Sequence, residues 1–290
     1  MSKSWTREDV FGDKWSPHPL EELIEARPPV AWGAVNRWAN DDKAELKQWI
    51  GKQAKWRYHH GLDFLHDSPG FYAAYARRVD TMFAMVKDAL QTAGVDPAMS
   101  SFVDLGAAEG YTSNLAYDLG ARDIDSCDFS EINIERLWKI RAFTDRLYGR
   151  VGTIDLEHVE WSAQLGRTYD VALALGVVYH MENPMLFCRN LHKVAPVAIV
   201  ESDTPVFPQN ERFRGFGNIY LHRDQVTQSI GEDGKGRVRY LTELRPDRQA
   251  LVELLLNAGF TKVVAIEPPP SAESHYYVSG EKSVLIAYSN

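Results

Sequence analysis

The stretch VDLGAAEGY, residues 103–111, decides which fold this sequence predicts. A short apolar run ends there in an acid and a glycine, and residues 111–119 then show a helical pattern that stops at Gly120. Gly106 allows a sharp turn between strand and helix, and Gly110 allows the new helix to approach a ligand closely. The stretch is therefore typical of the first strand-to-helix turn of a sheet in which strands alternate with helices.

The same alternation continues to residue 288. Buried or short strands are expected at 101–105, 124–128, 151–154, 169–176, 197–202, 262–267 and 283–288, and helices at 131–148, after Asn183 and Pro184, and from Pro246 to Gly259. Such alternation predicts an α/β fold, a Rossmann-like sheet of mainly parallel strands with helices on both faces.

Residues 1–98 have a different composition. Six of the eight tryptophans fall within the first 56 residues, and helical patterns are expected at 20–26, 34–53 and 71–92. The sequence thus predicts an N-terminal helical cap, residues 1–98, on a core of residues 99–290. Within that core, residues 204–240 are expected to form a lid insertion.

Composition restricts the class of protein. The chain of 290 residues has 32 Lys and Arg against 40 Asp and Glu, a net charge of −8, which argues against binding of nucleic acid through a general basic surface. No apolar run is long enough to span a membrane, and residues 1–15 do not resemble a signal peptide.

Two isolated cysteines, Cys127 and Cys188, suit buried thiols in a cytoplasmic protein, and no metal site is expected at the paired His59 and His60. The oligomeric state stays open, with a homodimer allowed.

The acids of the glycine turn indicate the kind of ligand. Asp104 and Glu109 disfavour a phosphate and favour an ammonium group, and Ala108 stands where a dinucleotide-binding turn would have its middle glycine. Asp128, at the end of the second core strand, can accept hydrogen bonds from the ribose hydroxyls of an adenosine. An adenosine ligand that carries an amine and no phosphate is S-adenosylmethionine.

With these features, residues 101–290 resemble the class I S-adenosylmethionine-dependent methyltransferases. The resemblance rests on VDLGAAEGY, CDFS (127–130), YDVALALGVVYHMENP (169–184) and the AGF turn (258–260). It implies a seven-stranded sheet whose last strand is antiparallel. By matching position, it implies a methionine-binding group (Asp104, Gly106, Ala107, Gly110), a ribose-binding Asp128, an adenine-binding group (Phe129, Ile154, Asp155) and a Gly176 carbonyl near the sulfonium. The sequence departs from the family pattern at Ala108 and in the polar strand around residues 122–127.

GVVYHMENP together with GNIYL (217–221) resembles one branch of that family more closely, the wobble-uridine carboxymethyltransferases and their relatives. That branch has a similar Tyr-His after the fourth strand, uses a carboxylated form of the cofactor and has an arginine entering the final strand. Here Lys282 takes the comparable place, and lysine keeps the positive charge without the bidentate fork that a carboxylate prefers.

Tyr179 and His180 are the expected catalytic residues. His180 is the best-placed general base if the acceptor must lose a proton, and the alternative is a structural histidine that caps the next helix. Tyr179 is expected either to pack over the cofactor or to touch the substrate. Glu201 and Asp203, at the end of the fifth strand, could bind a cationic acceptor, but a solvated strand end is the expected arrangement.

Side chains from the two covering segments are expected to bind the acceptor: Trp56, Tyr58, His59, Arg214 and Tyr220, together with Lys282. The leading hypothesis is a methyltransferase that acts on a small metabolite in a biosynthetic pathway. The alternatives are a tRNA wobble-uridine carboxymethyltransferase, an enzyme that uses the same cofactor for aminobutyryl transfer or cyclisation, and a cofactor-binding scaffold without catalysis.

Overall fold

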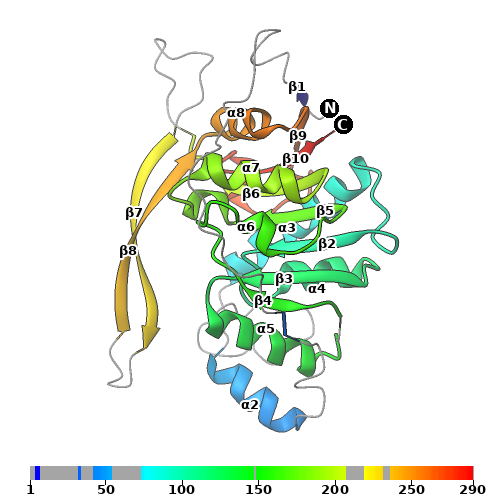
Figure 1. The fold of residues 1–290 in the computed structure, drawn as a ribbon, viewed down its shortest axis with the longest axis vertical. Coiled ribbons are helices and arrows are strands. Elements are labelled where there is room, and N and C mark those ends of the chain that lie inside the picture. The colour runs from blue at the N-terminus through cyan, green and yellow to red at the C-terminus, as the bar shows by residue number, and fades with distance from the viewer. Residues whose placement is uncertain are drawn as a thin grey trace.

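A single mixed sheet forms the centre of the molecule in the computed structural model, which describes residues 4–6, 32–33, 42–53, 73–146, 148–206, 219–230 and 236–289. The sheet has eight strands in the order β1-β9-β10-β6-β5-β2-β3-β4 (Figure 1). Its strands are β1 (Ser4–Thr6), β2 (Ser101–Leu105), β3 (Asp123–Asp128), β4 (Val151–Thr153), β5 (Val171–Leu175), β6 (Val197–Asp203), β9 (Lys262–Ile266) and β10 (Lys282–Tyr288). Two further strands, β7 (Ile219–Ile230) and β8 (Gly236–Pro246), pair with each other in a separate two-stranded sheet.

The pairing of the strands confirms the predicted core. β2, β3, β4, β5 and β6 pair in parallel, whereas β10 lies antiparallel between β6 and β9. Without β1, this is the seven-stranded sheet with an antiparallel last strand that the family resemblance implies. The eighth strand, β1, was not expected: it pairs antiparallel with β9 and so places residues 4–6 at an edge of the core sheet.

Helices cover both faces of the sheet, as predicted. The helices are α2 (Lys43–Gln53), α3 (Ala73–Thr92), α4 (Tyr111–Asp118), α5 (Glu131–Phe143), α6 (Trp161–Gln164), α7 (Pro184–Val194), α8 (Arg248–Ala258) and α9 (His275–Val278), with a 3-10 turn, η3 (Val178–His180). Successive strand residues point to opposite faces, so Phe102 packs with the buried residues of α3 and α4, while Val103 packs with those of α6, α7 and α8. This period of two, together with apolar helix stripes, produces two hydrophobic layers around the sheet.

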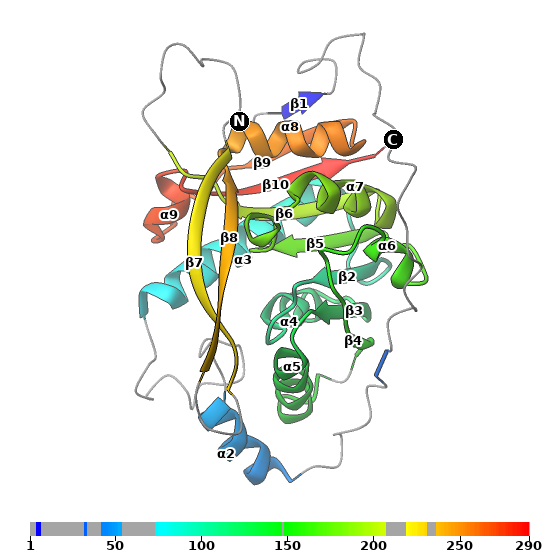
Figure 2. The ribbon, with the colours of Figure 1, turned by 60° about the vertical axis from the view of Figure 1, so that its left-hand side comes forward.

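The segment between β6 and α8 differs from its prediction. We expected an irregular lid over 204–240, but Ile219–Ile230 and Gly236–Pro246 form a long antiparallel hairpin with an irregularity between Thr227 and Ser229. The hairpin stands beside the sheet and extends from the level of α8 to that of α5 (Figures 1 and 2). Its β8 strand contacts η3, which follows β5, so the root of the hairpin lies at the carboxyl edge of the parallel strands.

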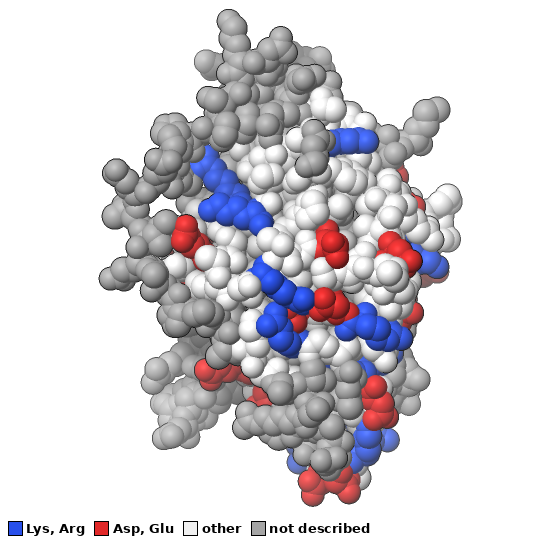
Figure 3. Space-filling model, turned by 45° about the vertical axis from the view of Figure 1, so that its right-hand side comes forward, with Lys and Arg blue, Asp and Glu red and all other residues white. Residues whose placement is uncertain are grey.

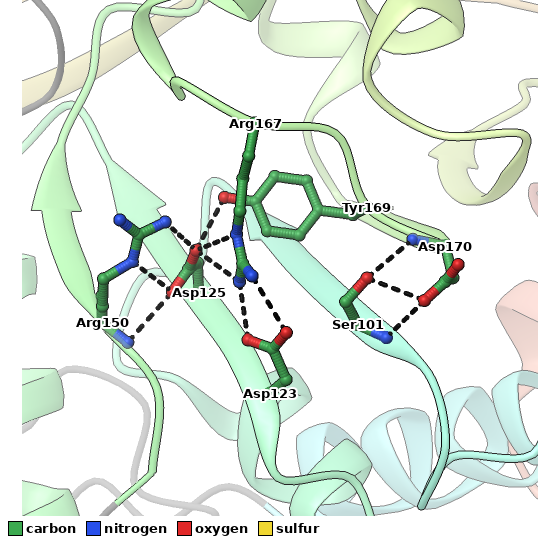
Figure 4. Close-up of polar contacts among 7 residues, drawn as sticks. All are labelled: Ser101, Asp123, Asp125, Arg150, Arg167, Tyr169 and Asp170. Atoms are coloured by element: carbon green, nitrogen blue, oxygen red, sulfur yellow. Dashed lines mark hydrogen bonds and ion pairs between the residues drawn. The ribbon is translucent and has the colours of Figure 1, made fainter.

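The unusually polar strand β3 is buried because each of its polar groups has a partner. Asp125 accepts hydrogen bonds from Arg150 Nη2 at 2.5 Å, Arg167 Nη2 at 2.8 Å and Tyr169 Oη at 2.7 Å. Burial acts to raise the pKa of Asp125, but the hydrogen bonds from Arg150 and Tyr169 and the charge of Arg167 outweigh it and hold that pKa below its ordinary value. Figure 4 shows this cluster beside the hydrogen-bonded pair Ser101–Asp170. The cluster and the pair together hold the amino-terminal ends of β2, β3 and β5 next to one another.

The described pieces of the N-terminal part contact the core at several places. Arg150 lies over the Trp32 ring at 4.5 Å, and Lys139 of α5 lies over the Trp49 ring of α2 at 4.5 Å. The expected helix at 20–26 lies outside the described residues, and of the expected helix at 34–53 the structure describes α2. The division near residue 98 stays a prediction.

Several local predictions can be compared with the structure directly. Cys127 and Cys188 are free and buried, as expected. Helix α5 is shorter than predicted because Asp145, two residues beyond its end, takes a positive φ of 56°. In the parts of the chain that the structure describes, no helix is long and apolar enough to cross a membrane.

Candidate functional site

The turn between β2 and α4 lies at the carboxyl edge of the sheet. Gly106 and Gly110 both take positive φ angles, 67° and 81°. A side chain at position 106 would lie 2.6 Å from Val177 Cγ2, and one at position 110 would lie 2.8 Å from Leu137 Cγ. Both glycines are therefore required by contacts within the protein itself. The sequence suggested that Gly110 lets a ligand come close to the turn, but in the structure it is Leu137 of α5 that packs against Gly110.

Asp128 fixes the shape of this turn. Its Oδ2 accepts a hydrogen bond from the Ala108 N–H at 2.9 Å, and its Oδ1 accepts one from the Ser130 N–H at 2.9 Å. The first of these bonds helps to hold Ala108 at a φ of 47°, a conformation that alanine rarely adopts. Asn133 also donates to Oδ1, at 3.1 Å. The carboxylate is thus held in one orientation at the end of β3.

Asp104 lies beneath the turn, with its carboxylate directed at α4. Ser113 Oγ donates to Asp104 and lies 2.8 Å from Ser126 Oγ, which in turn accepts a hydrogen bond from Arg141 Nη2 at 2.7 Å. Burial raises the pKa of Asp104 to about 7, against the opposing effects of the Ser113 hydrogen bond and the Arg141 charge. The sequence did not reveal Ser113, Ser126 or Arg141; the polar character of β3 was the only signal.

The predicted adenine-binding residues lie together at the ends of β3 and β4. Phe129 follows Asp128 and is 59% exposed, which is unusual for a phenylalanine. Ile154 donates its N–H to the Asp128 carbonyl at 2.9 Å, but its side chain is buried in the core. Asp155 is exposed and accepts the Glu157 N–H at 3.0 Å. The other predicted turn residue, Ala107, is buried and donates its N–H to the Cys127 carbonyl at 2.9 Å.

A second polar group lies at the ends of β5 and β6 and the start of β10. Gly176 takes a φ of 74°, and a methyl group placed on it would lie 3.6 Å from both Glu201 Oε2 and Tyr179 Oη. The Tyr179 and His180 rings lie 4.2 Å apart. Asn183 caps α7 by accepting the Leu186 N–H at 3.0 Å, so the capping role considered for His180 belongs to Asn183.

Glu201 contradicts the expectation of a solvated strand end, since it is only 1% exposed. Its Oε1 accepts a hydrogen bond from Tyr277 Oη and forms an ion pair with Lys282 Nζ, each at 3.0 Å. Lys282 also contacts Asp203 and lies over the Tyr179 ring at 5.3 Å. The ammonium group that we expected to bind substrate is therefore paired with two carboxylates of its own chain.

The remaining predicted site residues come from segments that are not described. Trp56, Tyr58, His59 and Arg214 lie outside the described residues, and of Tyr220 the structure describes only the backbone in β7. Across the described ranges, no group of His, Cys, Asp and Glu side chains could hold a metal ion. Tyr277 is a site residue that the sequence did not indicate, because it comes from the short helix α9 just before β10.

Known proteins resemble this chain in fold. No family model and no curated protein matches the chain. The N-terminal domain of EvdMO1, crystallised in the presence of SAH and D-fucose, matches with a TM-score of 0.52 and 18% identity over 87% of this chain and 99% of that chain. The same domain with SAH bound gives a TM-score of 0.51 at 18% identity, again over 87% and 99% of the two chains. Magnesium protoporphyrin IX methyltransferase from Synechocystis PCC 6803 has a TM-score of 0.49 at 17% identity, over 86% of this chain and 100% of that one. The chain has a Rossmann-like methyltransferase fold.

Proposed function

We propose that this chain is an S-adenosylmethionine-dependent methyltransferase that methylates a small-molecule acceptor. The observation that carries the proposal is the carboxyl-edge turn, in which a fixed Asp128 carboxylate stands beside the exposed Phe129 ring. The fold supports it, because EvdMO1, which shares this fold, was crystallised with SAH bound. In this reading Asp128 accepts the ribose hydroxyls and Phe129 packs against the adenine.

The residues present fit this cofactor better than a phosphate-bearing one. Asp104 and Glu109 are both buried at the turn, and their carboxylates disfavour a phosphate there. When bound, the cofactor supplies a methyl group on a sulfonium. The protein would contribute position and exclusion of water, with Gly176, Tyr179 and His180 at the end of β5 beside the reacting atoms. His180 would take a proton from an acceptor that must lose one.

A small-molecule acceptor suits the surface better than a nucleic acid does. The chain has a net charge of −8, and among the described residues on the face drawn in Figure 3 lysines and arginines lie interspersed with acids. The β7–β8 hairpin, whose root contacts η3, and the N-terminal part are the segments proposed to choose the acceptor. In this role Trp56, Tyr58, His59, Arg214 and Tyr220 stay predictions.

The carboxymethyl alternative requires a cation that is available to the carboxylate of its cofactor. Lys282 Nζ lies 3.0 Å from Glu201 Oε1 and also contacts Asp203, so a third carboxylate would meet two like charges. This pairing favours a cofactor without the extra carboxylate. Aminobutyryl transfer and cyclisation use the same cofactor and are distinguished by their sulfur-containing product.

Two measurements test the proposed function. Titration calorimetry should show binding of S-adenosylhomocysteine (SAH) and S-adenosylmethionine to the wild-type chain; absence of binding would overturn the proposal. Mass spectrometry of turnover mixtures should then detect SAH as the product. Methylthioadenosine in its place would indicate aminobutyryl transfer or cyclisation.

A further inference from the structure

Glu201 is a buried carboxylate whose two oxygens have unequal surroundings. Oε1 is contacted by Tyr277 Oη and Lys282 Nζ, both at 3.0 Å, whereas Oε2 accepts no hydrogen bond from any residue that the structure describes. The Glu201 side chain is 1% exposed. A buried carboxylate oxygen that accepts no hydrogen bond within the protein destabilises the fold unless water or a ligand supplies the donor. Such an oxygen is expected where a ligand supplies the donor.

The position of Oε2 indicates that the ligand it faces is the methyl acceptor. A methyl group on Gly176 would lie 3.6 Å from Oε2 and 3.6 Å from Tyr179 Oη, so the three groups surround one point at the carboxyl end of β5. In sheets of this kind ligands bind beyond the carboxyl ends of the strands. The proposed function places the reacting methyl at this end of β5, and the neighbour of that methyl is the acceptor atom.

The charges around Glu201 select the chemistry of the acceptor. Lys282 is shared between Glu201 and Asp203, and Arg245 Nη1 lies 3.5 Å from Asp203 Oδ2. The two acids and two cations balance, and the groups turned toward Gly176 are the Glu201 Oε2 oxygen and the Tyr179 hydroxyl. A hydroxyl or an amine could donate a hydrogen bond to Oε2, whereas a carboxylate or phosphate on the acceptor would be repelled by it.

We propose that Glu201 Oε2 binds the acceptor through an N–H or O–H group at or next to the atom that is methylated. The assignment rests on the proposed function, since it takes the end of β5 as the reaction centre. Tyr277 and Lys282 are positioning residues in this arrangement, because they hold Oε1 and thereby turn Oε2 toward Gly176. The acceptor is accordingly an alcohol, a phenol or an amine, and its anionic groups, if any, lie away from Glu201.

The test uses three probes that share one scaffold: benzylamine, benzyl alcohol and benzoate. Saturation-transfer NMR would measure their binding to the full chain saturated with SAH. We expect benzylamine or benzyl alcohol to bind, and benzoate to bind at least tenfold more weakly. Higher affinity for benzylamine would indicate an amine acceptor, and higher affinity for benzyl alcohol a hydroxyl acceptor. Glu201→Gln should weaken the stronger probe at least tenfold and leave SAH affinity unchanged. Glu273→Gln, an exposed glutamate on the same segment as Tyr277, is the matched control and should change neither.

A second variant guards against a folding defect. Glu201→Gln leaves Lys282 with one carboxylate fewer, whereas Glu201→Gln combined with Lys282→Met removes both members of the ion pair and should remain folded in circular dichroism. This double variant should also lose the probe. The assignment is overturned if benzoate binds as well as the other two probes, if no probe binds, or if both variants keep the wild-type probe affinity. Failure of the wild type to bind SAH would instead overturn the proposed function.

Discussion

Asp125 and Glu201 are equally buried carboxylates at opposite ends of the parallel strands, and their surroundings differ completely. At the amino end, both oxygens of Asp125 accept hydrogen bonds, and the donors come from Arg150, Arg167 and Tyr169 (Figure 4). At the carboxyl end, only one oxygen of Glu201 has donors among the described residues. The hydrogen bonds of Asp125 stabilise the fold, whereas the Glu201 oxygen that accepts no hydrogen bond from a described residue is suited to a ligand.

Strand β3 carries one structural acid and one acid of the proposed ribose site. Asp125 ties its amino-terminal half to neighbouring loops, and Asp128 ends it beside the glycine turn. Substitutions three residues apart on this strand should therefore affect different measurements.

Asp128→Ala should give the largest effect, on cofactor binding. Removing the carboxylate removes the two proposed ribose hydrogen bonds and the anchor of the Ala108 N–H. We expect the Kd for SAH to rise about 100-fold, which is about 2.7 kcal/mol. Titration calorimetry measures this, and an unchanged Kd would contradict the proposed ribose site.

Asp125→Ala should lower stability and leave cofactor affinity unchanged. Arg150 and Arg167 are partly exposed and would be solvated after the loss of their partner, so the free energy of unfolding should fall by about 2 kcal/mol and not more. Urea denaturation followed by circular dichroism measures the loss. If Asp125→Ala weakened SAH binding as much as Asp128→Ala, the two ends of β3 would not be separate in function.

Asp104 offers a pH-dependent measure of the carboxyl end. Its pKa of about 7 leaves the carboxyl about half protonated at pH 7. A cofactor ammonium group near it would lower that pKa, so the complex would hold fewer protons than the free chain. Binding of SAH at pH 7 should then release about half a proton, and release should vanish at pH 9, where the carboxyl is already ionised.

Calorimetry in phosphate and in Tris, which differ in ionisation enthalpy, would count those protons. Asp104→Asn should abolish the release. Proton uptake in place of release would show that no positive group of the cofactor approaches Asp104.

Ala108→Gly should give the smallest effect. Glycine adopts a φ of 47° without the penalty that alanine incurs, but it also has more freedom in the unfolded chain. We expect the free energy of unfolding to rise by about 0.5 kcal/mol. The Kd for SAH should stay the same because the N–H bonded to Asp128 is retained. A weaker Kd would indicate that the alanine methyl group itself contacts the ligand.

The sequence by itself determined the layers and the main turn of this protein. Some signals are local: the buried run at residues 171–175 has apolar residues on both faces, and Asn183 with Pro184 marks the start of a helix. From such signals the mainly parallel sheet, the helices on both of its faces and the glycine turn could be predicted. Asp128 could be assigned to the carboxyl edge because a strand end has a fixed position relative to the sheet.

Tertiary structure decided the pairings between distant residues. Nothing local to Arg150 and Arg167 indicates that they neutralise Asp125, and nothing near Glu201 indicates Tyr277 or Lys282, which follow it by more than seventy residues. The short strand β1 and the β7–β8 hairpin were missed for the same reason, because their stability depends on partners elsewhere in the chain. Local patterns specify which face of an element is buried; only the folded chain specifies which buried polar groups find a partner within the protein and which are left for a ligand.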